Sequence, residues 1–247
     1  MMSLSRRAPI LWLTLRQFRA GRATWLAALF AATPILLAVI HRLGSRSVSD
    51  AEFLANLFLE VLAPTVVPLA TLMLATNALG NELADRTVPY LLLKPIARAR
   101  IVVEKFLASA LVTSLTLAVG LLVTWAVASS GAERSSRMLA ALLGGTLAGM
   151  LAYGALFMLI SLLIQRALLV GIIYALIWES ALARFIPGVK LLSIRHFSQS
   201  VFVRLLDDPT VTLDRALQLP SALAVLVVVT VAALTVASLL LRRINAA

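Results

Sequence analysis

The chain has 247 residues, 61% hydrophobic and 13% charged, against about 25% charged residues in soluble domains, which leaves no room for a soluble catalytic domain. Its net charge of +11 could suit nucleic acid. The basic residues, however, stand at the ends of apolar runs and not along one continuous face, which indicates membrane topology and argues against nucleic-acid binding. The absence of cysteine excludes disulfides and thiolate chemistry.

Residues 8–22 combine arginines with large apolar side chains. Arg16, Arg19 and Arg22 interrupt the apolar stretch, which fits a cleaved signal peptide poorly. Trp and Phe beside Arg are typical of the lipid headgroup zone, so we expect an amphipathic helix lying on the membrane surface. The side chains that would enter the membrane are Trp12, Leu13, Leu15 and Phe18. The alternative is a basic flank of the first span with no role of its own.

Five runs of at least 18 residues contain no Asp, Glu, Lys or Arg. They are 23–40, 61–81, 106–132, 138–165 and 216–241. A helix needs about 20 mostly apolar residues to cross roughly 30 Å of hydrocarbon, and inside a bilayer its backbone groups must be paired within the segment. A shorter run, 167–178, continues through Glu179. Pro34, Pro64 and Pro68 should bend the first two spans.

These runs predict an all-α integral membrane protein, with one transmembrane domain over residues 1–247 and six spans. The expected spans are about 23–43, 57–79, 103–128, 138–164, 167–184 and 220–241. Thirteen Lys and Arg residues then fall on the side of both termini and nine on the other side, so the positive-inside rule places both termini in the cytoplasm.

Two connections are longer than the others, a cytoplasmic loop over 80–102 and an external loop over 185–219. In the external loop, 189–206 alternates apolar and polar residues roughly as an amphipathic helix does. We expect this helix to lie on the outer surface or to dip partly into it, and the sequence Asp207-Asp208-Pro209 to end it.

Few polar side chains lie inside the expected spans. Asn77 and Glu179 are candidates for a translocation path, because polar groups within a bilayer are costly and tend to be functional. Glu179 could instead lie at the boundary between membrane and water. Gly145 and Gly149 form a G-x-x-x-G, which predicts close helix packing within the chain or against a neighbour. With only two histidines in the chain, we expect no metal site.

The cytoplasmic loop carries the most specific pattern. Glu82 and Arg86 are four residues apart, the spacing of an ion pair on one helix face, and Pro89 and Pro95 limit any helix beyond them. Residues 90–93 form an apolar patch rimmed by basic residues. Such a patch suits docking of another protein or contact with the membrane.

This loop resembles the first cytoplasmic loop of the permease subunits of type-2 ABC exporters. The family pattern is E-x-x-x-[G/R]-T, then L-L, a Pro, a basic residue and a Lys that opens the third helix. The matching residues are Glu82, Arg86, Thr87, Leu91, Leu92, Pro95, Arg98 and Lys105, with Arg86 where many members have Gly. A second stretch after the fifth span is similar to the same permeases: Trp178-Glu179, Pro187-Gly188 and Leu192-Ser193-Ile194.

The resemblance implies a permease that is not an enzyme and binds no cofactor itself. Its loop would dock on a separate ABC ATPase, present in two copies, which binds ATP and Mg; this chain has no G-x-x-x-x-G-K-[S/T] motif. A second copy, or a similar permease, would complete the path across a bacterial cytoplasmic (inner) membrane. The alternative is a gradient-driven secondary transporter or channel, but such proteins usually bury several ionisable groups at mid-membrane. An intramembrane enzyme would need reactive side chains that the spans lack.

Overall fold

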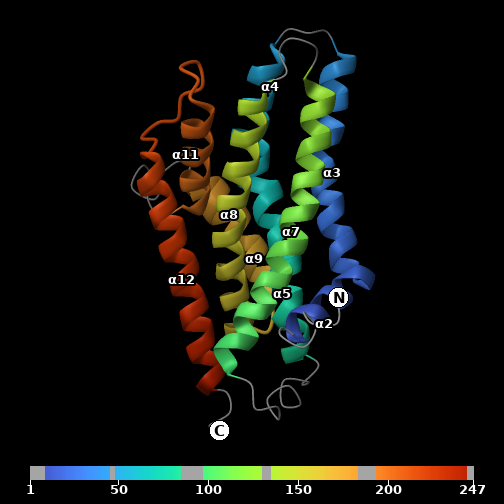
Figure 1. The fold of residues 1–247 in the computed structure, drawn as a ribbon, viewed down its shortest axis with the longest axis vertical. Helices are drawn as coiled ribbons and strands as arrows, with labels where there is room; N and C mark the ends of the chain where they lie inside the picture. Colours follow the sequence, from blue (N-terminus) through green and yellow to red (C-terminus); the bar gives the residue numbers. More distant parts are fainter. Residues whose placement is uncertain (1–8, 45–47, 85–96, 130–134, 183–192, 244–247) are drawn as a thin grey trace.

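The computed structural model describes residues 9–44, 48–84, 97–129, 135–182 and 193–243, and every element in them is a helix. In chain order the helices are α2 (Pro9–Ala20), α3 (Arg22–Leu43), α4 (Asp50–Leu57), the π-helix η1 (Phe58–Val66), α5 (Val67–Ala84), α7 (Arg98–Ala128), α8 (Ser136–Leu163), α9 (Ala167–Ile173), the π-helix η3 (Tyr174–Leu182), α11 (Ile194–Leu206) and α12 (Leu219–Arg243). They form one elongated bundle (Figure 1).

Five stretches of helix are long and apolar enough to cross a membrane. They are Arg22–Leu43, Asp50–Ala78, Arg98–Ala128, Ser136–Leu163 and Leu219–Leu241. These helices confirm five of the expected spans. The prediction succeeds because the length of an apolar run is set by the sequence itself and does not depend on how the helices pack.

Two of these spans begin earlier than predicted. The second begins at Asp50 and not at 57, because the Ser49 hydroxyl caps its first turn by accepting a hydrogen bond from the Glu52 N–H at 3.2 Å. The third begins at Arg98 and not at 103. The sequence-based prediction missed both starts because charged residues in the first turn of each helix lie outside the apolar runs.

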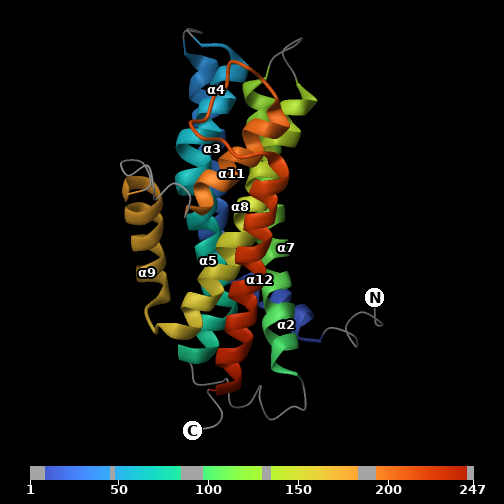
Figure 2. The ribbon, with the colours of Figure 1, turned by 90° about the vertical axis from the view of Figure 1, so that its left-hand side faces the viewer.

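The expected fifth span, 167–184, corresponds to α9 and η3. Its apolar part, Ala167–Glu179, is shorter than the other five, so a sixth span stays a prediction. Figure 2 shows α9 set apart at one side of the bundle, where it contacts α5 and α8.

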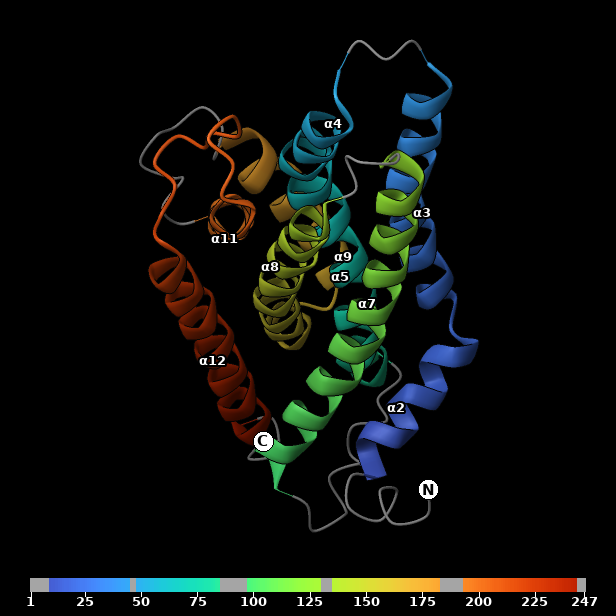
Figure 3. The same cartoon turned by 45° about the horizontal axis from the view of Figure 1, so that its top comes forward.

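Helix α11 forms within the stretch 189–206, which was expected to lie on the outer surface or to dip partly into it. It lies inside the bundle against α8, α12 and η1, and nine of its 13 residues are buried (Figure 3). The predicted stop is confirmed, since the helix ends at Leu206 and Asp207 follows in the left-handed conformation at φ 51°. Amphipathic periodicity is the same whether the polar face meets water or protein, and here it meets protein.

The centre of the bundle is formed by the second and fourth spans, which are 67% and 61% buried, against 22–39% for the other three. The G-x-x-x-G of α8 faces α11 within the same chain. A Cβ placed on Gly145 would lie 3.0 Å from the Phe202 Cβ, and one on Gly149 would lie 2.8 Å from the Ser198 Oγ. The prediction of close packing within the chain is confirmed.

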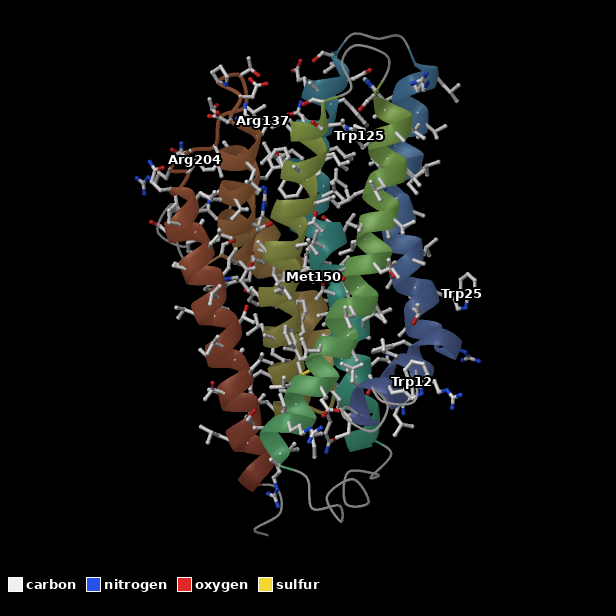
Figure 4. All side chains as sticks on the ribbon, in the orientation of Figure 1. Trp12, Trp25, Trp125, Arg137, Met150 and Arg204 are labelled. Atoms are coloured by element: carbon white, nitrogen blue, oxygen red, sulfur yellow. The ribbon has the colours of Figure 1, made fainter. Side chains whose placement is uncertain are left out.

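One end of the bundle gathers α2, the end of α5, the start of α7 and the end of α12 (Figure 1). Trp12 lies toward this end, and Trp125 lies toward the other with Arg137 and Arg204, while Trp25 is near mid-height (Figure 4). Tryptophans at two levels are typical of the two faces of a membrane.

Helix α2 lies obliquely across this end against α7. Trp12 and Leu13 are exposed, as a surface helix in lipid requires, but Phe18 is buried in the bundle. The expectation that Phe18 enters the membrane is therefore wrong, because this side of α2 packs against protein.

Candidate functional site

The described part of the predicted coupling loop forms the end of the bundle that carries α2. Helix α5 continues to Ala84 and so includes Glu82 in its backbone, while α7 starts at Arg98. The two helices therefore extend into the expected loop 80–102 from both of its ends. The Glu82 side chain, together with Arg86, Thr87, Leu91, Leu92 and Pro95, lies outside the described residues.

Arg98 and Lys105 both connect α7 to neighbouring helices. The Arg98 guanidinium donates to the carbonyl of Leu241 at 3.2 Å, in the last turns of α12. The Lys105 ammonium donates to the carbonyl of Ala78 in α5 at 2.7 Å, and its side chain is only 1% exposed. Lys105 therefore does not open the third helix, as the resemblance implied, but lies two turns inside it. Figure 3 shows α7 and α12 diverging from the end where Arg98 meets Leu241.

Glu104 attaches α2 to the same end. Its buried carboxylate accepts hydrogen bonds from the backbone N–H groups of Ile10 and Leu11, at 3.1 and 3.2 Å, and from Arg100 Nε at 2.6 Å. The first N–H groups of a helix have no partner within it, and a negative charge there is favoured by the helix dipole. We did not predict this contact. The spacing of Arg100 and Glu104 indicates the ion pair, but not the attachment of α2.

Glu179, a predicted path residue, plays the same part for α11. It is fully buried, and it accepts hydrogen bonds from the hydroxyls of Tyr174 and Ser193 and from the backbone N–H groups of Ile194 and Arg195. The two backbone contacts are 3.0 and 3.3 Å long. The carboxylate is thus enclosed by protein within this chain, and its place in a translocation path stays a prediction.

Asn77, the second predicted path residue, is partly buried in α5. Its amide donates to the carbonyl of Met73, one turn back in the same helix, at 3.2 Å. The hydrogen bonds of Asn77 and Glu179 involve different elements, so these contacts do not bring the two residues into one site.

The polar face of α11 binds carbonyl groups of the core helices. Gln199 Nε2 donates to the carbonyl of Leu59 in η1 at 2.7 Å, and the Ser198 hydroxyl donates to the carbonyl of Gly145 at 2.9 Å. Arg195 reaches the same Leu59 carbonyl at 3.5 Å. No spacing in the sequence indicates these contacts, because they join segments more than 50 residues apart.

Within the described ranges, no three His, Asp or Glu side chains gather as metal ligands. The buried carboxylates of Glu104 and Glu179 bind the first N–H groups of α2 and α11, and the buried ammonium of Lys105 binds a backbone carbonyl.

Comparison with known proteins identifies the family. No curated protein sequence matches the chain. A family model described as ABC-2 family transporter protein matches residues 12–186, which include most of α2, the first four spans and the whole connection between α5 and α7. With this match and its five membrane-length helices, the chain belongs to the ABC-2 family of transporter proteins, as a multi-pass membrane permease.

Proposed function

We propose that this chain is the permease subunit of an ATP-driven exporter and transmits the motion of a separate ATPase to a translocation path. The family match over residues 12–186 carries the proposal. The export direction rests on the resemblance of Glu82, Arg86-Thr87 and the following loop to type-2 ABC exporters. Each functional unit would contain two ATPase copies, which bind ATP and Mg, and a second permease.

The contacts at the α2 end support a coupling role for this end. Arg98 joins the start of α7 to α12, Lys105 joins α7 to α5, and Glu104 joins it to α2. A force applied between α5 and α7 would therefore also reach α2 and α12. Under the positive-inside rule this end, which holds most of the basic residues, faces the cytoplasm of a bacterial cell.

The proposal is tested by co-purification with the ATPase encoded beside the permease gene. We expect a stable complex with the intact chain, and loss of binding or of ATPase stimulation in the triple variant Glu82→Ala, Arg86→Ala, Arg98→Ala. Arg137→Ala is the matched control, because Arg137 is exposed at the opposite end of the bundle (Figure 4).

Equal gel-filtration profiles of the three proteins would show that each permease is folded. If no ATPase binds the intact chain, or if the triple variant binds and couples normally, the proposal is wrong. A gradient-driven transporter then becomes the better explanation.

A further inference from the structure

An acidic side chain lies exposed deep within the second span. Glu60 belongs to η1, ten residues beyond Asp50, which corresponds to about 15 Å along a helix axis. The Asp50 carboxylate lies 3.3 Å from Nε2 of His41, in the last turn of α3, so the ends of the two helices are level. Glu60 is therefore about three turns below the end of the bundle.

Other helices expose apolar side chains over this depth. Leu36, Val39 and Ile40 of α3 are 37–61% exposed, and outward-facing valines and leucines follow the same pattern on α7 and α12. These surfaces suit lipid. Within the described ranges, Glu60 is the one ionisable side chain that is exposed more than two turns from both ends of its span.

Glu60 continues a polar stripe from the end of the helix. Glu52, Asn56 and Glu60 follow at intervals of four residues, which places them on one face, and all three are exposed. Phe58 lies nearly opposite Glu60 around the helix and is fully buried, stacked on Phe202 with ring centroids 4.2 Å apart. The packing of Phe58 thus holds the Glu60 side of η1 away from the core.

The surroundings of Glu60 within the chain leave its carboxylate available. No hydrogen bond or ion pair joins it to any other residue in the described part of the chain. Arg195 is the cationic side chain that contacts η1. Its guanidinium donates to the Leu59 carbonyl and to the Glu179 backbone carbonyl. A carboxylate at this depth is costly against hydrocarbon and favourable against water or a cation.

We propose that the stripe of Glu52, Asn56 and Glu60 lines the aqueous path of the transporter, where Glu60 binds the positively charged group of an amphipathic cargo. The inference rests on the proposed function for the existence of the path and adds the chemical class of the cargo. A single carboxylate at this depth, among the apolar surfaces of the other helices, favours a molecule with one cationic group and an apolar body over a small inorganic ion, which would need several ligands.

The absence of cysteine from the chain allows a direct test by thiol labelling. Asn56→Cys places a reporter one turn from Glu60, and Leu36→Cys is its control, because Leu36 lies at the matching level of the antiparallel helix α3 and is 61% exposed. The probes are two membrane-impermeant methanethiosulfonates, one with a trimethylammonium group and one with a sulfonate group, applied with and without the ATPase.

We expect both probes to modify Asn56→Cys and neither to modify Leu36→Cys. Relative to a free thiol, the cationic probe should be favoured about tenfold at Asn56→Cys, because a carboxylate in a confined path concentrates cations. Adding Glu60→Gln should remove this preference. Gel filtration of each variant checks its fold.

Two results would overturn the inference: an Asn56→Cys thiol as unreactive as that of Leu36→Cys, or a charge preference that Glu60→Gln leaves unchanged. The first result includes the case in which a second permease covers the stripe. If the protein shows the charge preference but binds no ATPase, the ATP-driven function is refuted and the path is supported. Failure of the proposed function and failure of this inference are therefore distinguishable.

Discussion

The side-chain amide of Gln199 replaces the hydrogen bond that Pro64 cannot donate. In a π-helix each N–H pairs with the carbonyl five residues earlier, so residue 64 would pair with Leu59. Proline has no N–H, and Gln199 Nε2 donates to the Leu59 carbonyl at 2.7 Å instead. The irregular segment of the second span and the buried helix α11 therefore stabilise each other.

Because Gln199 takes the place of the missing Pro64 N–H, we expect the effects of variants at these two positions on the free energy of unfolding to be non-additive. Gln199→Leu leaves Leu59 with only the 3.5 Å contact of Arg195, and should lower the free energy of unfolding by about 2 kcal/mol. Pro64→Ala supplies a backbone N–H that can pair with the Leu59 carbonyl. In the Pro64→Ala protein, Gln199→Leu should therefore lower the free energy of unfolding by at least about 1 kcal/mol less than it does in the natural chain. Unfolding titrations of the four proteins in mixed micelles measure the difference, and simple additivity would contradict the pairing.

Removal of the Glu179 carboxylate should loosen α11. Glu179→Ala leaves four donors without their acceptor in a buried site, which should cost on the order of 3 kcal/mol. Hydrogen exchange should rise at the first amides of α11. Thr235→Val is the control, since Thr235 is exposed and bonds only within α12. Unchanged exchange in α11 would show that Glu179 does not hold this helix.

Gly145 and Gly149 of α8, which face α11, should tolerate no side chain. A Cβ on Gly145 would lie 2.6 Å from the Phe58 ring and one on Gly149 would lie 2.8 Å from the Ser198 hydroxyl. Alanine at either position should destabilise the protein by about 1–3 kcal/mol. Gly154→Ala is the matched control on the same helix, because its Cβ would meet neighbours at 3.4 Å. If Gly154→Ala had a lower melting temperature than the other two variants, the packing argument would be refuted.

Glu104 should determine whether α2 stays attached. Glu104→Ala removes the acceptor of the Ile10 and Leu11 amides, so their hydrogen exchange should accelerate about tenfold or more. Arg100→Gln removes the 2.6 Å ion pair but leaves both backbone contacts, and should change exchange much less. Equal effects of the two variants would mean that the ion pair, and not the backbone contact, holds α2.

Lys105 should act through position and not through direct docking. Because its side chain is 1% exposed and bonds the Ala78 carbonyl, Lys105→Met should leave ATPase binding intact and lower ATPase stimulation. The triple variant at Glu82, Arg86 and Arg98 should instead weaken binding. Loss of binding by a folded Lys105→Met protein would contradict this division.

Elements with long apolar runs agreed closely with the prediction. The fourth span was expected at 138–164 and is Ser136–Leu163, and the first was expected at 23–43 and is Arg22–Leu43. In these cases the bilayer imposes length and composition, and no distant contact is needed to choose the helix. The start of the second span was missed because Asp50 and Glu52, in the first turn of its helix, lie outside the apolar run.

The sequence by itself determined that this protein is helical and membrane-embedded, where its long spans run, and that Gly145 and Gly149 allow close packing. Only the tertiary structure decided that Glu179 and Glu104 hold the starts of two other helices, that α11 is buried, and that Glu60 lies exposed within a span. The physical reason is that span formation is local, since a helix in lipid pairs its own backbone. The partner of a charged or amide side chain depends on which helices meet, and residues such as Leu59 and Gln199 are 140 positions apart.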